Sequence, residues 1–119
     1  MMQDKKLQLQ TEFENYLNGK GEFSPYYPGM NVLTSTLYKE QLKEILKLLE
    51  EENSADAKNF ELYLSTIIFN MHTKVKKYKQ SIYFDNVNIK DIDNQGYTIP
   101  FYIDEKKNTY ILLGLVRSE

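Results

Sequence analysis

The sequence of 119 residues contains no cysteine and one histidine, His72. Without cysteine the chain has no disulfides, no thiolate metal ligands and no thiol nucleophile, and a single histidine cannot build a histidine-rich metal centre. We therefore expect neither a metal nor a cofactor. No carboxylate stands three or four residues from His72 to orient it as a general base, so we interpret it as a structural residue.

Long apolar runs and a strong net charge are also missing. No apolar run reaches the roughly 20 residues that a membrane-spanning helix needs, and the N-terminus has no signal sequence. We therefore expect a cytoplasmic protein without membrane contacts. Lysine and arginine total 15 against 17 acidic residues, which gives a net charge of −2 and a pI near 5.5. Such a chain has no overall field that would hold DNA, so a DNA-coating role is excluded.

The charge is distributed unevenly along the chain. Residues 1–57 carry six lysines and ten acidic residues, whereas residues 58–119 carry nine cationic and seven acidic residues. We therefore expect an anionic ligand to bind the C-terminal half.

The length suits one domain over residues 1–119. Apolar residues at helical spacing predict a short helix over residues 4–18. A loop rich in glycine, proline and aromatic residues follows, so that residues 1–34 are predicted as helix and loop. Its aromatic side chains, Phe23, Tyr26 and Tyr27, are expected to fold back onto the body of the protein.

Residues 35–79 predict a helical hairpin. Apolar positions repeat every three or four residues over residues 35–52 and again over residues 54–79. Asn53 and Ser54 interrupt the pattern, and we expect Ser54 to cap the second helix. Helices joined by so short a connection pack antiparallel.

Residues 81–117 change to an alternating pattern that predicts an antiparallel meander. Pro100 indicates a sheet edge or a bulge, because proline cannot donate to the ladder. The last strand, residues 110–116, is apolar on both faces and is expected to be covered on both sides. The predicted fold is therefore α+β, with the helices packed on a C-terminal antiparallel sheet of three to four strands. The alternation places four apolar side chains of the first strands in the core: Ile82, Phe84, Val87 and Ile89.

Cations and one tyrosine of the C-terminal half suggest a site for RNA. RNA cleavage without a metal needs a group that accepts the 2′-hydroxyl proton, cations that stabilise the phosphoryl oxygens, and a donor for the leaving oxygen. We interpret Lys90, Tyr97 and Arg117 as candidate catalytic residues. The candidate RNA-binding residues are Lys76, Lys77 and Lys79. The same pattern has a structural explanation, in which the lysines solubilise a helix end and Tyr97 fills the core.

The segment from Gly96 to Glu105, with strand 110–116 and Arg117, resembles the ending of RelE/ParE-type toxins of bacterial toxin–antitoxin pairs. The resemblance implies a helical hairpin on an antiparallel sheet, with a strand before the hairpin. It implies mRNA cleavage by Lys, Arg and Tyr side chains, with Lys90 and Arg117 at the matching positions. The implied partners are an acidic cognate antitoxin and mRNA or the ribosome.

The chain departs from this family at two places. Thr98 stands where the family usually has arginine, which leaves open the gyrase-inhibiting branch or a related toxin with other active residues. Residues 1–34 are predicted as helix and loop, without the strand that usually precedes the hairpin.

A second function, from a different class, is a protein that acts by binding another protein, such as an immunity protein, an antitoxin-like inhibitor or a phage anti-defence protein. The ten tyrosines and the acidic first half favour a recognition surface. In this interpretation Tyr26, Tyr27 and residues 50–52 face a basic partner. The sequence does not specify an oligomeric state.

Overall fold

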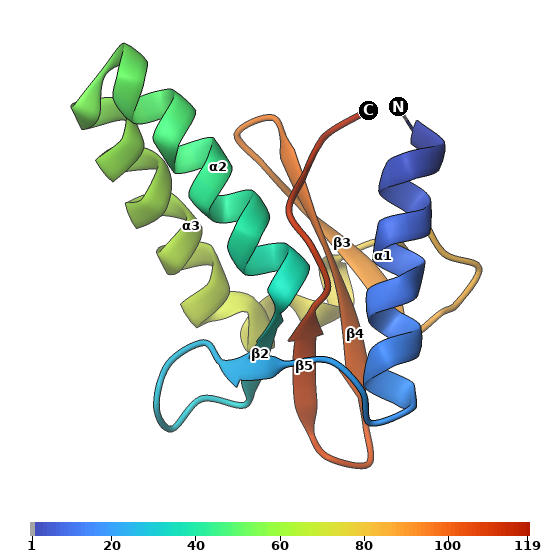
Figure 1. The fold of residues 1–119 in the computed structure, drawn as a ribbon. Helices are drawn as coiled ribbons and strands as arrows, with labels where there is room; N and C mark the ends of the chain where they lie inside the picture. The colour runs from blue at the N-terminus through green and yellow to red at the C-terminus, as the bar shows by residue number, and fades with distance from the viewer. Residues whose placement is uncertain (1) are drawn as a thin grey trace.

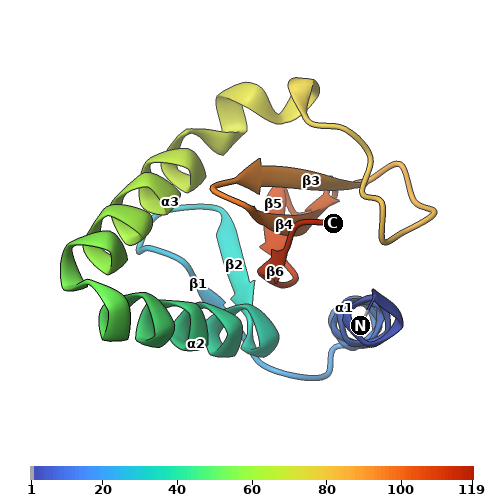
Figure 2. The same cartoon turned by 90° about the horizontal axis from the view of Figure 1, so that it is seen from above.

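The computed structural model describes the backbone of residues 2–119 and the side chains of residues 4–119. Helix α1 (Met2–Leu17) lies on one face of a curled sheet, and the antiparallel pair α2 (Thr36–Glu52) and α3 (Ser54–Lys74) covers the other, as Figures 1 and 2 show. The described chain is therefore α+β with helices on both faces of the sheet. No helix in this part of the chain has both the length and the apolar character needed to cross a membrane.

The sheet is mixed and has six strands, which corrects the expectation of a C-terminal antiparallel sheet of three to four strands. The additional strands are β1 (Phe23–Pro25) and β2 (Val32–Ser35), in the segment predicted as loop. Strand β2 pairs in parallel with β5 (Thr109–Leu112), with Val32 opposite Tyr110. This pairing joins segments that are far apart in the sequence, so the local pattern of residues 1–34 gave no sign of it.

The predicted helical hairpin is confirmed, with α2 followed by α3. Two corrections concern the ends of α3. Asn53 caps α3, because its side chain accepts a hydrogen bond from the N–H of Ala55 at 2.9 Å, and Ser54 is the first helical residue. The second helix ends at Lys74 instead of residue 79, and a 3-10 turn, η1 (Val75–Lys77), follows it. The chain turns there toward the edge of the sheet.

The segment before β3 (Ile89–Asn94) does not form the predicted strand over residues 81–84. Ile82 and Val87 point outward and are 60% and 75% exposed, whereas Tyr83 is fully buried. The cause is local, because the buried carboxylate of Asp91 accepts a hydrogen bond from the N–H of Ile82 at 3.0 Å. This contact holds the segment as a loop along the edge of β3 and reverses the expected alternation. Of the four apolar side chains predicted for the core here, Ile89 is fully buried and Phe84 partly so.

Strand β3 and strand β4 (Tyr97–Asp104) form a hairpin with a two-residue turn. Gln95 and Gly96 both have positive φ, at 54° and 83°, as a type I′ turn requires. The turn places Asn94 opposite Tyr97 and Lys90 opposite Phe101. This register decides which of the candidate residues meet.

The last apolar segment is two strands instead of one. Strand β5 ends at Leu112, and β6 (Val116–Arg117) resumes the pairing with β4. Phe101 pairs with Leu112 and Thr98 with Val116, so the C-terminal segment has one residue more than β4 and forms a bulge. The carbonyl of Pro100 accepts from Leu113 within this interruption, which confirms the bulge predicted from Pro100.

Two apolar clusters cover the two faces of the sheet. Neighbouring residues of β5 point to opposite clusters, Leu112 toward α2 and α3 and Ile111 toward α1, and both are fully buried. The expectation that the last strand is covered on both sides is confirmed.

Helix α1 is the cover on the second face. Leu9 is fully buried there, and the helix is held at both ends by polar contacts. Lys5 Nζ lies 3.1 Å from Glu119 Oε1 near one end, and the Tyr16 hydroxyl donates to Asp104 at 2.6 Å near the other. The described ends of the chain therefore lie side by side (Figure 1).

Candidate functional site

Tyr97 and Arg117 lie side by side at one end of the sheet. They are register partners on β4 and β6, so their side chains leave the sheet on the same face. That face is the one covered by α3, because the Tyr97 ring packs edge to face on Phe60 with centroids 5.4 Å apart. Arg117 is exposed. The pair therefore offers one phenol and one guanidinium at a solvent-accessible end of the sheet.

Asn94 continues this row and was not identified as a site residue from the sequence. It pairs with Tyr97 from the β3 side. Its Nδ2 is buried and has no hydrogen-bond partner among the described residues. The sequence contains the signal, because a two-residue turn at Gln95 and Gly96 dictates that Asn94 faces Tyr97. Because this amide nitrogen is buried, Asn94 faces the pair without offering a donor at the surface.

Lys5 is a second residue of this region that sequence reasoning missed. Its Nζ donates to the backbone carbonyl of Arg117 at 3.0 Å and also contacts Glu119. Only the docking of α1 brings it there, and no local pattern predicts that docking. The cation is shared with a carboxylate, so its contribution to an anionic ligand is small.

Thr98 points away from the pair. It is 2% exposed and faces α1, where its hydroxyl bonds to the side chains of Asp93 and Ser118. The row of Asn94, Tyr97 and Arg117 therefore receives nothing from position 98.

Lys90 does not join the pair. Its register partner Phe101 lies four residues from Tyr97, which is about 13 Å along a strand. Its Nζ donates to the carbonyl of Val75 at 2.8 Å, at the C-terminal end of α3. A cation is favoured at that end by the helix dipole, so the position of Lys90 has a structural cause.

The candidate RNA-binding lysines lie with Lys90 and not with the pair. Lys76 and Lys77 are on η1, Lys79 follows, and all three are exposed. Lys77 and Lys79 line a groove of about 380 Å³ together with two acidic residues, Asp91 and Asp93. The groove therefore carries both signs of charge.

Asp91 is the buried acidic residue of this groove. Burial raises the pKa of its carboxyl above the usual value, although hydrogen bonds from Ser81 and from the N–H of Ile82 oppose the shift. Its Oδ1 is buried without a hydrogen-bond partner among the described residues. Burial also raises the pKa of the Tyr83 hydroxyl, to about 12, and three nearby carboxylates add to this shift. Both groups are structural, because neither polar atom is reached by solvent.

The geometry therefore divides the candidates into two groups. Tyr97 and Arg117 form one, with Asn94, and Lys90 lies with Lys76, Lys77 and Lys79 in the other. In the part of the chain that the structure describes, no three acidic, histidine or cysteine side chains come close enough to hold a metal ion. No family model and no curated protein matches the sequence.

Proposed function

We propose that the protein is a small toxin of the RelE/ParE type that cleaves RNA without a metal and so inhibits translation. The observation that carries the proposal is strand β2. It immediately precedes the helical hairpin and lies within the sheet, beside β5. The resemblance of the C-terminal segment implies a strand at this place, and the prediction of helix and loop for residues 1–34 was one of the two departures from that family, beside Thr98.

In the proposed reaction the 2′-hydroxyl of RNA attacks the adjacent phosphorus. The 2′-oxygen gives its proton to water, the bond to the 5′-oxygen breaks while that oxygen takes a proton from water, and the products are a 2′,3′-cyclic phosphate and a 5′-hydroxyl. Arg117 binds the phosphoryl oxygens as their negative charge grows. Tyr97, the neighbour of Arg117 on β4, either positions the proton that is transferred or stacks on a base of the RNA.

Lys90 takes a different part from the one the sequence suggested. At about 13 Å from Tyr97 along β4, it cannot contact the same phosphate as Arg117. With Lys76, Lys77 and Lys79 it attracts the RNA backbone some nucleotides away from the cleaved bond. A cognate antitoxin is the expected protein partner, and it would block the exposed Arg117.

The experiment is RNA cleavage by the purified protein, with and without ribosomes. Arg117→Ala should lower the cleavage rate by on the order of 10²–10³, as the loss of other transition-state donors does. Lys106→Ala, which removes an exposed cation from the β4–β5 turn, is the matched control and should cleave like the wild type. Equal cleavage by wild type and Arg117→Ala would refute the assigned site, and no cleavage under either condition would refute the nuclease.

A protein-binding inhibitor is the second candidate, and one observation favours it. The outer face of α3 exposes Leu62, Tyr63 and Phe69, and Tyr27 packs on Phe69 with ring centroids 5.4 Å apart. Exposed aromatic clusters are typical of recognition surfaces. Residues 50–52 end α2 at the tip of the helical hairpin. They would therefore lie at the other end of this surface from Tyr27.

The two candidates differ in what Tyr63→Ser does. A toxin nuclease keeps its RNA cleavage in this variant, because Tyr63 is 59% exposed and belongs to neither group of candidate RNA residues. An inhibitor loses binding to its target protein, which is to be sought among the products of neighbouring genes. Retained target binding by Tyr63→Ser would remove this surface from consideration.

A further inference from the structure

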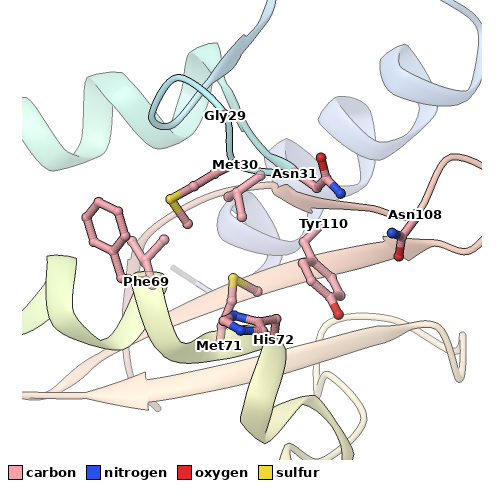
Figure 3. A pocket seen from close by; sticks show the side chains of 10 residues that line it. Gly29, Met30, Asn31, Phe69, Met71, His72, Asn108 and Tyr110 are labelled. Carbon is pink, nitrogen blue, oxygen red and sulfur yellow. The ribbon is translucent and has the colours of Figure 1, made fainter.

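A cavity of about 510 Å³ opens between α3 and the N-terminal ends of β2 and β5 (Figure 3). Its volume lies in the range of small-molecule sites. Val32 and Ile68, both buried, belong to its lining. Phe69 and Tyr110 stand on opposite sides of the opening, and Met30 and Met71 lie between them (Figure 3). The walls are therefore aromatic rings and flexible thioethers.

Four polar groups from separate segments surround this apolar lining. They are the side chains of Asn31, His72 and Asn108 and the hydroxyl of Tyr110. Among residues 4–119, none of these side chains forms a hydrogen bond with another protein group. His72, which the sequence suggested to be a partly exposed structural residue, is exposed and lines this cavity. The cavity thus holds several donors and acceptors that remain available to a ligand.

We propose that this cavity binds the base of a nucleotide. A base has flat apolar faces, which stack on aromatic rings and contact thioethers, and an edge of donors and acceptors, which pairs with carboxamides. No acidic side chain lines the cavity, so its lining does not repel the negative phosphate of a nucleotide.

The base site is distinct from the Tyr97–Arg117 pair. Tyr110 pairs with Ile103, six residues along β4 from Tyr97, which is about 20 Å. If the protein cleaves RNA as proposed above, the bound base belongs to a nucleotide several positions from the cleaved bond. Only the assignment of the base to an RNA strand rests on the proposed function. Base binding itself does not, because a free nucleotide presents the same base.

The test uses the fact that His72 is the only histidine. Its imidazole gives one set of proton NMR signals, which are observed while AMP, GMP, CMP or UMP is added at constant pH. At least one of these nucleotides should shift the His72 signals in a saturable way. Ribose 5-phosphate, which lacks the base, should shift them much less. Absence of a shift with all four nucleotides, or an equal shift with ribose 5-phosphate, would overturn the proposal.

Two variants locate the binding. Asn31→Ala removes one carboxamide, and Asn108→Gly removes the other while it tolerates the positive φ of 51° at this position. Each should weaken nucleotide binding by about threefold to tenfold, as the loss of one hydrogen bond does. Asn59→Ala removes an exposed carboxamide from α3 thirteen residues before His72 and should bind like the wild type. Unchanged binding by both cavity variants would place the base elsewhere.

The source of the base follows from the same titration with a short single-stranded RNA. Tighter binding of the RNA than of the best mononucleotide assigns the cavity to an RNA strand, and equal binding assigns it to a free nucleotide. The result is independent of the proposed nuclease. If Arg117→Ala abolishes cleavage while His72 never responds to nucleotides, the nuclease stands and the base site is refuted.

Discussion

Gly114 sits where α1 approaches the bulge between β5 and β6. A Cβ atom at this position would lie 2.5 Å from Leu9 Cδ2 and 3.0 Å from Gln41 Oε1. Leu9 is fully buried, and Gln41 Oε1 already accepts from the N–H of Leu115 at 2.7 Å, so neither neighbour moves freely. We therefore expect Gly114→Ala to destabilise the fold by about 1–3 kcal/mol, the usual cost of overpacking.

The cause is tested by removing the neighbour. Leu9→Ala alone should cost about 2–5 kcal/mol, but it also opens the space that the new Cβ needs. The double variant should therefore lose at least about 1 kcal/mol less than the sum of the single variants. Urea unfolding followed by circular dichroism gives each free energy. Leu7→Ala, at a position of the same helix that is 64% exposed, is the matched control. Additive losses, or a Gly114→Ala protein as stable as the wild type, would refute the described docking of α1.

Two further predictions concern pH. The hydrogen bond from Tyr16 lowers the pKa of Asp104, so this contact stabilises the fold above the unfolded pKa of 3.8 and is lost as pH falls through the lower folded value. Tyr16→Phe should thus cost about 1 kcal/mol at neutral pH and progressively less as the pH falls below 3.8. Burial raises the pKa of Asp91, so its carboxylate opposes folding as pH rises above 3.8. Asp91→Asn, which keeps an acceptor for Ile82, should lose less stability than the wild type between pH 4 and pH 7.

Urea unfolding at several pH values checks both. A cost of Tyr16→Phe that does not decrease as the pH falls below 3.8 would contradict the assignment to Asp104. Asp85→Asn, at an exposed position of the loop before β3, is the control for Asp91→Asn. Identical pH profiles of Asp91→Asn and Asp85→Asn would contradict the role given to the buried carboxylate.

The helices were predictable because their signals are local. The apolar positions of α2 and α3 repeat at helical spacing within each segment. The same spacing continues to residue 79, although α3 ends at Lys74, so the pattern predicted a helix that is too long. Strand β2 was missed because its four residues are fixed by parallel pairing with β5, more than 70 residues later. The alternation after Gln80 misled because one buried carboxylate, Asp91, holds the N–H of Ile82 and keeps the segment out of the sheet.

The candidate site was predictable only in part. Residue types suggested cations and a phenol, but their grouping depends on register. The turn at Gln95 and Gly96 already fixes that register, so the separation of Lys90 from Tyr97 was available in the sequence. The approach of Lys5 to Arg117 was not, because it depends on the docking of a helix more than 100 residues away.

The most direct test of the proposed toxin is inducible expression of wild type and Arg117→Ala in a bacterial host, followed by growth and total RNA. We expect growth arrest with RNA cleavage for the wild type and normal growth for Arg117→Ala at an equal level of folded protein. Normal growth and intact RNA with both proteins, or arrest and cleavage with both, would contradict the account.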